Sequence, residues 1–234
     1  MQRYFAIGKE QDHFLLSPED HHHIAHVMRF RVGDHIQVVF ERQAYLCILE
    51  ENQIKTLQTL EQLEENTLEI ILLLPLLKEQ KMDFVLQKAT ELGVSKIIPV
   101  WTERSIVKLD PQRIEKKIER WTKICKEASE QSYRTTIPEI TRVCSYQELP
   151  TYDGLKLICS TKERQKSLRS SLQHLRNYDR IVIAIGPEGG LTDQEEETLV
   201  EQGYKRISLG RRILRVETVP IVLLGILNYE MMED

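Results

Sequence analysis

The sequence predicts an α/β fold with a parallel sheet, preceded by a small module built mainly of strands. Two observations support this prediction. In the first 66 or so residues, short strand-like runs predominate and one helical pattern interrupts them. From residue 68 onward, continuous apolar runs alternate with helical patterns, an order typical of a parallel sheet covered by helices on both faces. We therefore divide the chain into residues 1–68 and 69–234, long enough for two small domains.

In the N-terminal part, strands are expected at residues 3–7, 35–40 and 44–50. Only a short polar turn separates the last two, which favours a hairpin. A helix should begin after Ser17, a residue type that caps helices, with Pro18 at its first position. It should run to about residue 30 and stop near the turn at Gly33. A few short strands and one helix are typical of a compact barrel.

The C-terminal part is expected to alternate between strands and helices. The strands should occupy residues 68–77, 95–101, 155–161, 180–185 and 205–210. The helices should occupy residues 81–93, 111–133, 166–175, a segment that begins after Thr192, and 220–232. Gly93 would end the first helix, and Glu195 completes a capping box with Thr192. Pro220 is tolerated in the first turn of the last helix.

Composition and missing motifs narrow the class of protein. The net charge is −4, so any contact with nucleic acid must come from local basic patches. The four cysteines are widely spaced, and neither a secretory nor a membrane-spanning pattern occurs, so we expect a cytoplasmic protein with no membrane association. The lack of P-loop, dinucleotide-binding and nucleophile-elbow motifs argues against a P-loop NTPase, an ordinary Rossmann enzyme and a serine hydrolase.

A cluster of four histidines between residues 21 and 26 suggests a metal site at first sight. His22 and His26 lie one helical turn apart, but no acidic or cysteine side chain in this stretch completes a ligand set. A surface or RNA-facing helix is the favoured interpretation, and we expect no bound metal.

The stretch GPEGG at residues 186–190 directly follows an apolar strand and precedes the capped helix. Loops at the carboxyl ends of parallel strands are where open α/β sheets bind ligands, and glycines let a ligand approach the backbone closely. Glu188 argues against a phosphate, which its negative charge would repel. A structural turn whose glycines only satisfy geometry is the alternative.

A second loop, residues 208–220, also joins a predicted strand to a predicted helix. The two loops lie at the same edge of the sheet, so together they could enclose one small molecule. Its arginines, Arg211, Arg212 and Arg215, could hold an anion or a nucleic acid, or they could simply face water. Arg215 has apolar neighbours and lies close to Glu217, so it looks less like a free surface residue.

Taken together, these stretches resemble one known family. IGPEGG followed by an acidic helix, and then LGRRILRVET, resembles the RsmE-type ribosomal RNA methyltransferases of the SPOUT superfamily. Residues 21–36, 87–105 and 119–140 are similar to further segments of that family, in the same order, so the resemblance covers nearly the whole chain. Departures are small: Val216 stands where a threonine is common, and Val219-Pro220 replaces the usual alanines.

The resemblance implies a C-terminal SPOUT domain with a deep trefoil knot, an N-terminal PUA-like barrel that engages RNA, and a homodimer. The final helix is apolar on more than one face, as expected of a buried helix. The implied reaction transfers a methyl group from S-adenosylmethionine to N3 of one uridine, position 1498, in 16S rRNA of the small ribosomal subunit. A SPOUT methyltransferase with another RNA target, and a non-catalytic RNA-binding protein that keeps the knot, remain alternatives.

By the same resemblance, three loops would hold the cofactor, largely through backbone groups. The residues implied in cofactor binding are Cys159, Ser160, Thr161, Gly186, Pro187, Glu188, Gly189, Gly190, Ser208, Leu209, Gly210, Ile213 and Leu214. The candidate RNA-binding residues are Arg29, Arg31, Arg104, Arg134, Arg211 and Arg212.

The chemistry of uridine N3 suggests catalytic roles for two residues of the second loop. N3 is a poor nucleophile while it carries its proton. Arg215 could donate to a uracil carbonyl and spread the developing negative charge, and Glu217 is the nearest candidate base, or it only orients Arg215. The predicted long helix also carries basic residues that could contact phosphates or form a charged solvent face, namely Arg120, Lys123 and Lys126, with Arg134 just beyond.

Overall fold

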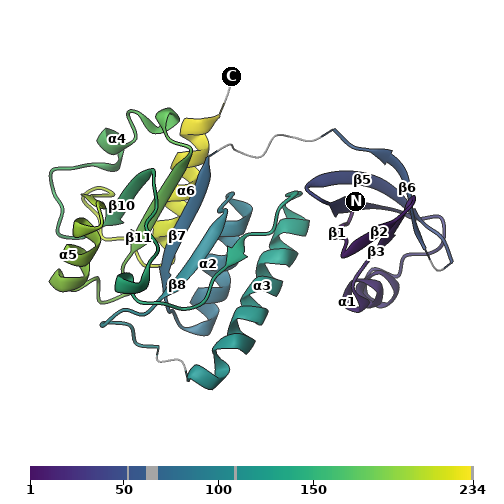
Figure 1. The fold of residues 1–234 in the computed structure, drawn as a ribbon, viewed down its shortest axis with the longest axis horizontal. Helices are drawn as coiled ribbons and strands as arrows, with labels where there is room; N and C mark the ends of the chain where they lie inside the picture. The colour runs from purple at the N-terminus through teal and green to yellow at the C-terminus, as the bar shows by residue number, and fades with distance from the viewer. Residues whose placement is uncertain (52, 62–67, 108–109, 233–234) are drawn as a thin grey trace. The chain divides into compact units, whose positions relative to one another are not determined.

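The structure, a computed structural model, describes residues 1–51, 53–61, 68–107 and 110–232 (Figure 1). It forms two compact units. One comprises Met1–Glu65 with Lys126–Ile137, and the other comprises Asn66–Cys125 with Pro138–Asp234. The predicted α/β class, with a mainly β N-terminal module, is confirmed. The second segment of the first unit was not anticipated from the sequence, and the domain boundary at residue 68 stays a prediction.

The first unit is built on a curled sheet of six short strands. These are β1 (Arg3–Phe5), β2 (Gly8–Glu10), β3 (His13–Leu15), β4 (His35–Phe40), β5 (Gln43–Leu49) and β6 (Ile54–Thr59). They pair in the order β1-β4-β5-β6-β3-β2, with β1 parallel to β4 and the other pairs antiparallel. Because only two residues separate β1 from β2, one chain segment pairs with β4 at one end and with β3 at the other. This segment bridges the ends of the curled sheet.

Local signals in this unit act as the sequence predicts. The helix α1 (Pro18–His22) is capped by Ser17, whose hydroxyl accepts a hydrogen bond from the Asp20 backbone N–H at 3.1 Å. The chain then continues as a π-helical turn, η1 (His23–Val27). Glu41 and Arg42, at the tip of the β4–β5 hairpin, both have positive φ, as a two-residue turn between twisted strands requires.

The second unit contains a six-stranded sheet in which every pair is parallel. Its strands are β7 (Glu69–Pro75), β8 (Lys96–Val100), β9 (Glu139–Ile140), β10 (Leu155–Cys159), β11 (Arg180–Ile185) and β12 (Lys205–Ile207), in the order β12-β10-β11-β7-β8-β9. Its helices are α2 (Glu79–Glu91), α3 (Ile114–Gln131, which ends in the first unit), α4 (Leu168–Ser171), α5 (Asp193–Glu201) and α6 (Thr218–Met231). Three short 3₁₀ turns, η2 (Pro111–Arg113), η3 (Tyr146–Glu148) and η4 (Leu175–Asn177), complete it.

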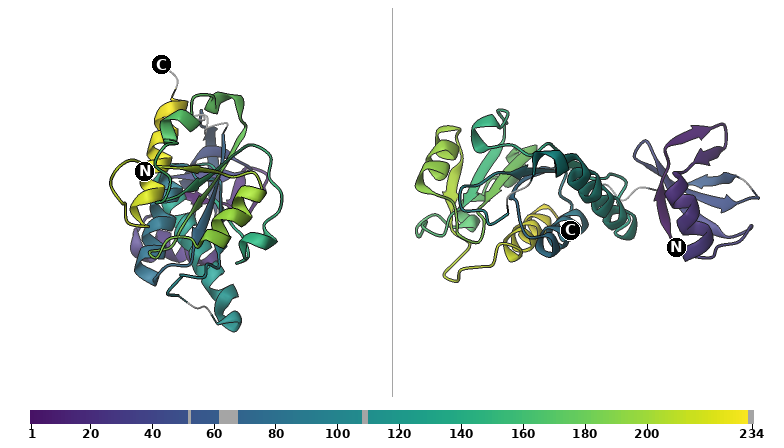
Figure 2. Two further views of the ribbon diagram at one scale, coloured as in Figure 1. Left: turned by 90° about the vertical axis from the view of Figure 1, so that its left-hand side faces the viewer. Right: turned by 90° about the horizontal axis from the view of Figure 1, so that it is seen from below.

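The parallel sheet is buried on both faces, which explains why its strands lack alternation. On one face, Ile71 and Leu73 of β7 pack in a core cluster with Leu199 of α5. Their neighbours of opposite orientation in β7, Leu72 and Leu74, are also fully buried. Helices α2 and α6 lie side by side (Figure 2), joined by a 3.0 Å hydrogen bond from Asn228 Nδ2 to the Leu92 carbonyl. Continuous apolar runs therefore mark strands covered on both sides.

One predicted helix is largely wrong. Residues 166–175 form only the short α4 and the turn η4. Ser167 caps α4, and the hydroxyls of Ser170 and Ser171 both donate to the Ser167 carbonyl. Such local side-chain bonds compete with a helical backbone. The strands β2, β3, β6 and β9 were not predicted. The first two and β9 have only two or three residues, and β6 carries no strong apolar pattern.

Within the described ranges, no helix combines the length and apolar character needed to cross a bilayer.

Candidate active site

The loops that follow β10 and β11 meet the chain that follows β12 around one cavity. Since β10 lies between β11 and β12 and all three strands are parallel, their carboxyl ends share one edge of the sheet. The cavity there has a volume of about 500 Å³, and a smaller one of about 60 Å³ adjoins it, sharing Cys159, Thr161, Ile213, Leu214 and Val219. Every residue predicted to bind the cofactor lines one or both cavities; its binding role stays a prediction.

The glycines of the two loops serve the backbone itself. Gly190 and Gly210 adopt φ of +70° and +114°, a region that strains other residues. A Cβ on Gly186 would lie 3.0 Å from the Leu191 backbone nitrogen, so a side chain there would force the loop open. The same glycines are therefore needed for the backbone conformation of the loops and for keeping the cavity free of side chains.

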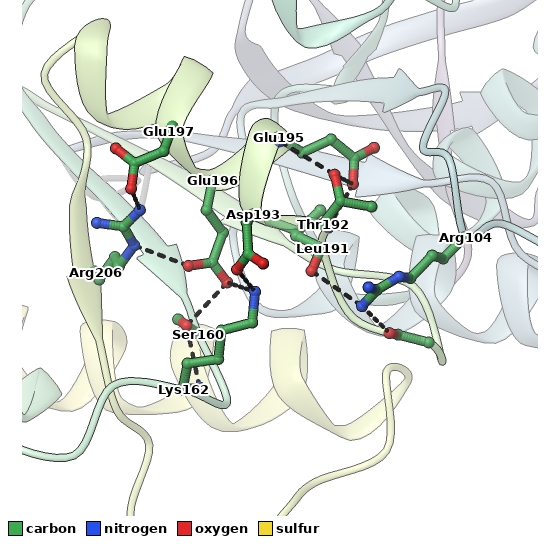
Figure 3. A network of polar contacts seen from close by, with 11 residues as sticks. Arg104, Ser160, Lys162, Leu191, Thr192, Asp193, Glu195, Glu196, Glu197 and Arg206 are labelled. Atoms are coloured by element: carbon green, nitrogen blue, oxygen red, sulfur yellow. Dashed lines mark hydrogen bonds and ion pairs between the residues drawn. The ribbon is translucent and has the colours of Figure 1, made fainter.

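A side chain from the loop after β8 holds the glycine loop from outside. Arg104 Nη1 donates to the Gly189 carbonyl at 3.2 Å and lies 3.4 Å from the Leu191 carbonyl (Figure 3). The sequence analysis proposed Arg104 as an RNA contact. In the structure it supports a wall of the cavity, a role that no sequence signal indicated.

A buried carboxylate that itself lines the cavity organises the wall formed by Cys159–Thr161. Glu196 of α5 is 4% exposed. Its carboxylate accepts hydrogen bonds from Ser160 Oγ at 3.0 Å and Arg206 Nε at 2.8 Å (Figure 3). Lys162 Nζ lies 3.7 Å from it and 2.6 Å from Asp193. This network ties the end of β10 to α5, and the sequence analysis did not single out Glu196.

The start of α5 is capped as predicted. The Thr192 backbone N–H and hydroxyl donate to Glu195 Oε2, and the Thr192 hydroxyl accepts from the Glu195 backbone N–H. Glu195 Oε1 also accepts a hydrogen bond from the Glu103 backbone N–H at 2.8 Å, so the cap binds the loop after β8 as well.

The cavity is also lined by a cation that was not predicted from the sequence. Lys81 of α2 lines the cavity, and its Nζ lies 2.9 Å from Glu188 Oε1 and 3.2 Å from Glu217 Oε2. The hydrogen bond to Glu188, together with Glu217, raises the pKa of Lys81. An isolated lysine at the start of a helix carries no sequence signal of such a role.

The exposure of Arg215 and the pKa of Glu217 bear on the catalytic roles suggested for these two residues. Arg215, which was expected to look less like a free surface residue, has an exposed side chain that lines the cavity, whereas its neighbour Val216 is buried. The pKa of Glu217 is lowered, first by a hydrogen bond from its own backbone N–H and then by Lys81 and Arg215, against the effect of burial. A carboxylate with a lowered pKa is a weaker base.

The thiol-bearing residue Cys159 also lines both cavities. Burial raises the pKa of its thiol to about 12. Because the thiolate is the reactive form, this side chain is inert near neutral pH and acts as part of the wall.

The remaining candidate residues are scattered. Arg211 and Arg212 are exposed in the second unit, and Arg29 and Arg31 are exposed in the first. Arg134 is only 9% exposed and donates to Thr136 Oγ1, which does not suit an open phosphate contact.

On the long helix, two of the basic residues are held by carboxylates. Arg120 pairs with Asp83 through both terminal nitrogens, and Lys126 pairs with Asp20 and Glu130. These contacts favour a structural role over phosphate binding.

The histidine cluster shows no ligand geometry. The rings of His22 and His26 lie 4.6 Å apart, and His23 Nδ1 lies 2.9 Å from the Tyr4 hydroxyl. Among the described residues, no three histidine, cysteine, aspartate or glutamate side chains come together as a metal site requires.

Comparison with known proteins agrees with this geometry. Residues 64–228 match the RNA methyltransferase domain family, and residues 16–57 match the RNA methyltransferase PUA domain family. Ribosomal RNA small subunit methyltransferase E of Bacillus subtilis is 37% identical over 249 residues, covering 98% of this chain and 97% of that protein. The chain belongs to the methyltransferase E family.

Other members of the methyltransferase E family agree. Ribosomal RNA small subunit methyltransferase E of Mesomycoplasma hyopneumoniae is 34% identical to this chain, and the match covers 96% of this chain and 97% of that protein. The Neisseria gonorrhoeae enzyme, whose crystal structure contains bound S-adenosyl methionine, has 29% sequence identity to this chain. The two structures superimpose with a TM-score of 0.84 over 98% of this chain and 97% of the Neisseria chain. The family resemblance noted from the sequence is confirmed.

Proposed function

We propose that this protein uses S-adenosylmethionine to methylate N3 of a uridine in 16S rRNA, position 1498 by family resemblance. One observation carries the proposal: a 500 Å³ cavity at the strand ends, walled by glycine-rich backbone and edged by Glu188, Lys81 and Arg215. Its volume suits a nucleoside-sized ligand. Glu188 and the buried Glu196 both line this cavity, and carboxylates tolerate a cationic sulfonium.

The Neisseria relative contains this cofactor, and the residues of this cavity fit it. Bound S-adenosylmethionine would supply an electrophilic methyl group next to the space left for the base. The backbone groups of the glycine loop and of residues 208–210 would hold the cofactor, because few side chains stand between them and the cavity.

Arg215 would act on the uracil. Its guanidinium lines the cavity and can donate to a uracil carbonyl oxygen, which stabilises the negative charge that develops as N3 loses its proton. The lowered pKa of Glu217 argues against its role as proton acceptor, and its carboxylate pairs with Lys81 rather than with Arg215. The N3 proton would therefore pass to solvent water at the exposed side of the cavity, where Arg215 lies.

The remaining parts of the proposal concern assembly and place of action. We propose that the N-terminal barrel, residues 1–68, engages the rRNA, that residues 69–234 form the knotted SPOUT domain, and that two copies form a homodimer in the cytoplasm. The exposed arginines Arg29, Arg31, Arg211 and Arg212 are the candidates for phosphate contacts.

Two experiments test this function. Calorimetry with S-adenosylmethionine should give a measurable heat of binding; an RNA-binding protein that has lost catalysis would give none. Small subunits from cells that lack the modification should then be methylated in vitro and the product mapped by nucleotide. Methylation at another nucleotide would establish a different RNA target and contradict the proposed position.

A further inference from the structure

We propose that Lys81 is a positioning residue for methyl transfer: its ammonium group neutralises Glu217 and so leaves the neighbouring guanidinium of Arg215 available to the uracil. The inference rests on the proposed function, because it concerns the reaction of the same cavity.

Lys81 connects segments that are far apart in the sequence. It lies in the first turn of α2, whereas Glu188 belongs to the loop after β11 and Glu217 immediately precedes α6. The Nζ atom is 2.9 Å from Glu188 Oε1 and 3.2 Å from Glu217 Oε2. An ammonium group has three N–H donors, so it can serve both carboxylates at once.

Glu217 needs this cation. Its Oε2 atom is buried and has no hydrogen-bond partner, so its contact with Lys81 is an ion pair, although the side chain as a whole is 18% exposed. A buried carboxylate without a compensating positive charge is costly. The groups that act on its pKa are its own backbone N–H, Lys81 and Arg215, and Glu188 faces the same ammonium from the glycine loop. Lys81 therefore supplies one of the two side-chain cations within reach of this carboxylate.

Arg215 is the other cation, and in the structure it remains uncommitted. Across the described part of the chain, no carboxylate lies within ion-pairing distance of it, and its exposed side chain lines the cavity. If Lys81 lost its charge, Glu217 would be left with Arg215, two positions away in the chain, as the nearest compensating cation. The guanidinium would then turn toward Glu217 and away from the uracil, and misplacement of a catalytic group slows a reaction strongly.

Four variants test this arrangement: Lys81→Met, Lys81→Arg, Glu217→Gln, and the double variant Lys81→Met with Glu217→Gln. Two quantities are measured for each: the affinity for S-adenosylmethionine by calorimetry, and the single-turnover rate on undermethylated small subunits. We expect Lys81→Met to lower the rate about tenfold and to leave the affinity within about threefold. Lys81→Arg keeps the charge and should retain most of the rate.

The double variant is the decisive measurement. Once Glu217 is neutral, nothing draws Arg215 away, so its rate should return to within about threefold of the Glu217→Gln variant. Removal of the ammonium also raises the pKa of Glu217. The rate of Lys81→Met relative to the wild type should therefore recover as the pH falls, because Glu217 becomes protonated at a higher pH in the variant than in the wild type.

Lys88→Met is a matched control. Lys88 lies on the same helix, is 34% exposed compared with 33% for Lys81, and forms a 2.7 Å ion pair with Glu91. It does not line the cavity, so this variant should keep the wild-type rate within about twofold.

Three outcomes would overturn the inference alone: a wild-type rate in Lys81→Met, a loss that Glu217→Gln does not relieve, or a single Glu217→Gln variant without activity. The last would make Glu217 the base. A wild-type protein that gives no heat with S-adenosylmethionine would contradict the proposed function and the inference together.

Discussion

Two charged clusters border the proposed cofactor cavity. They differ in how far they are exposed to solvent, and we expect them to differ in their effects on stability and activity. Glu196, 4% exposed, is enclosed by Ser160, Arg206 and Lys162. Lys81, 33% exposed, faces the cavity and holds Glu188 and Glu217. Glu196 and Lys81 both line the cavity. The contacts of Glu196 tie the end of β10 to α5, whereas Lys81 is partly exposed.

The difference follows from solvation. A carboxylate in the interior must be fully compensated, so the contacts of Glu196 are fixed and their loss should appear as lost stability. Charges at a cavity edge keep part of their hydration and can exchange partners. Changes in the second cluster should therefore alter activity more strongly than stability.

The largest expected effect lies in the loop between the clusters. Gly189→Val should abolish S-adenosylmethionine binding, measured by calorimetry, while thermal unfolding stays close to wild type. A Cβ at this position would already lie 3.1 Å from Arg104 Cβ, so a branched side chain must displace Arg104 or fill the cavity. Gly189→Ala should weaken binding less. Normal binding by a folded Gly189→Val variant would place the cofactor elsewhere.

The interior cluster is tested by Arg206→Met. Loss of the guanidinium leaves the buried Glu196 with only Ser160 and the more distant Lys162, so the free energy of unfolding should fall by about 3 kcal/mol, measured in urea. Arg180→Met is the control, because the Arg180–Glu69 pair is about one-third exposed and should contribute about 1 kcal/mol at most. Equal losses in both variants would remove the distinction between the clusters.

The cavity cluster is tested by Arg215→Ala. The single-turnover rate should fall by about a hundredfold or more, with cofactor affinity nearly intact and stability within about 0.5 kcal/mol, because the side chain is exposed. Arg215→Lys should rescue little, since a point charge does not reproduce the planar guanidinium.

For Arg215→Ala, partial recovery at high pH would link the defect to ionisation of N3. Wild-type turnover would reject the assignment and direct attention to Arg211 and Arg212.

The smallest effect concerns the cap that follows the glycine loop. Thr192→Ala should lower the free energy of unfolding by about 1 kcal/mol and leave cofactor affinity within about threefold. Thr198→Ala, further along α5, removes an exposed hydroxyl bonded to the Gln194 carbonyl and should change stability by about 0.5 kcal/mol or less. A large loss of binding in Thr192→Ala would mean that the cap also shapes the cavity.

Much of the second unit could be predicted because its signals are local. Residues 180–185 form a strand buried on both faces, and Thr192 and Glu195 cap the next helix as expected. The loop at residues 186–190 was singled out because loops at the carboxyl ends of parallel strands bind ligands and glycines let a ligand approach the backbone. Prediction failed at residues 166–175, where serine side chains bond to nearby backbone and the helix stops after four residues.

The sequence by itself determined most strands and helices of the second unit, the loops that follow β10, β11 and β12, and the family. Periodicity, caps and glycines act over a few residues, so they can be read along the chain. Only the tertiary structure decided which charges meet. Lys81 and Glu188 are 107 positions apart, and no local pattern links them. Their contact exists because a parallel sheet places the carboxyl ends of distant strands at one edge. Opposite charges that are partly buried there then pair with each other.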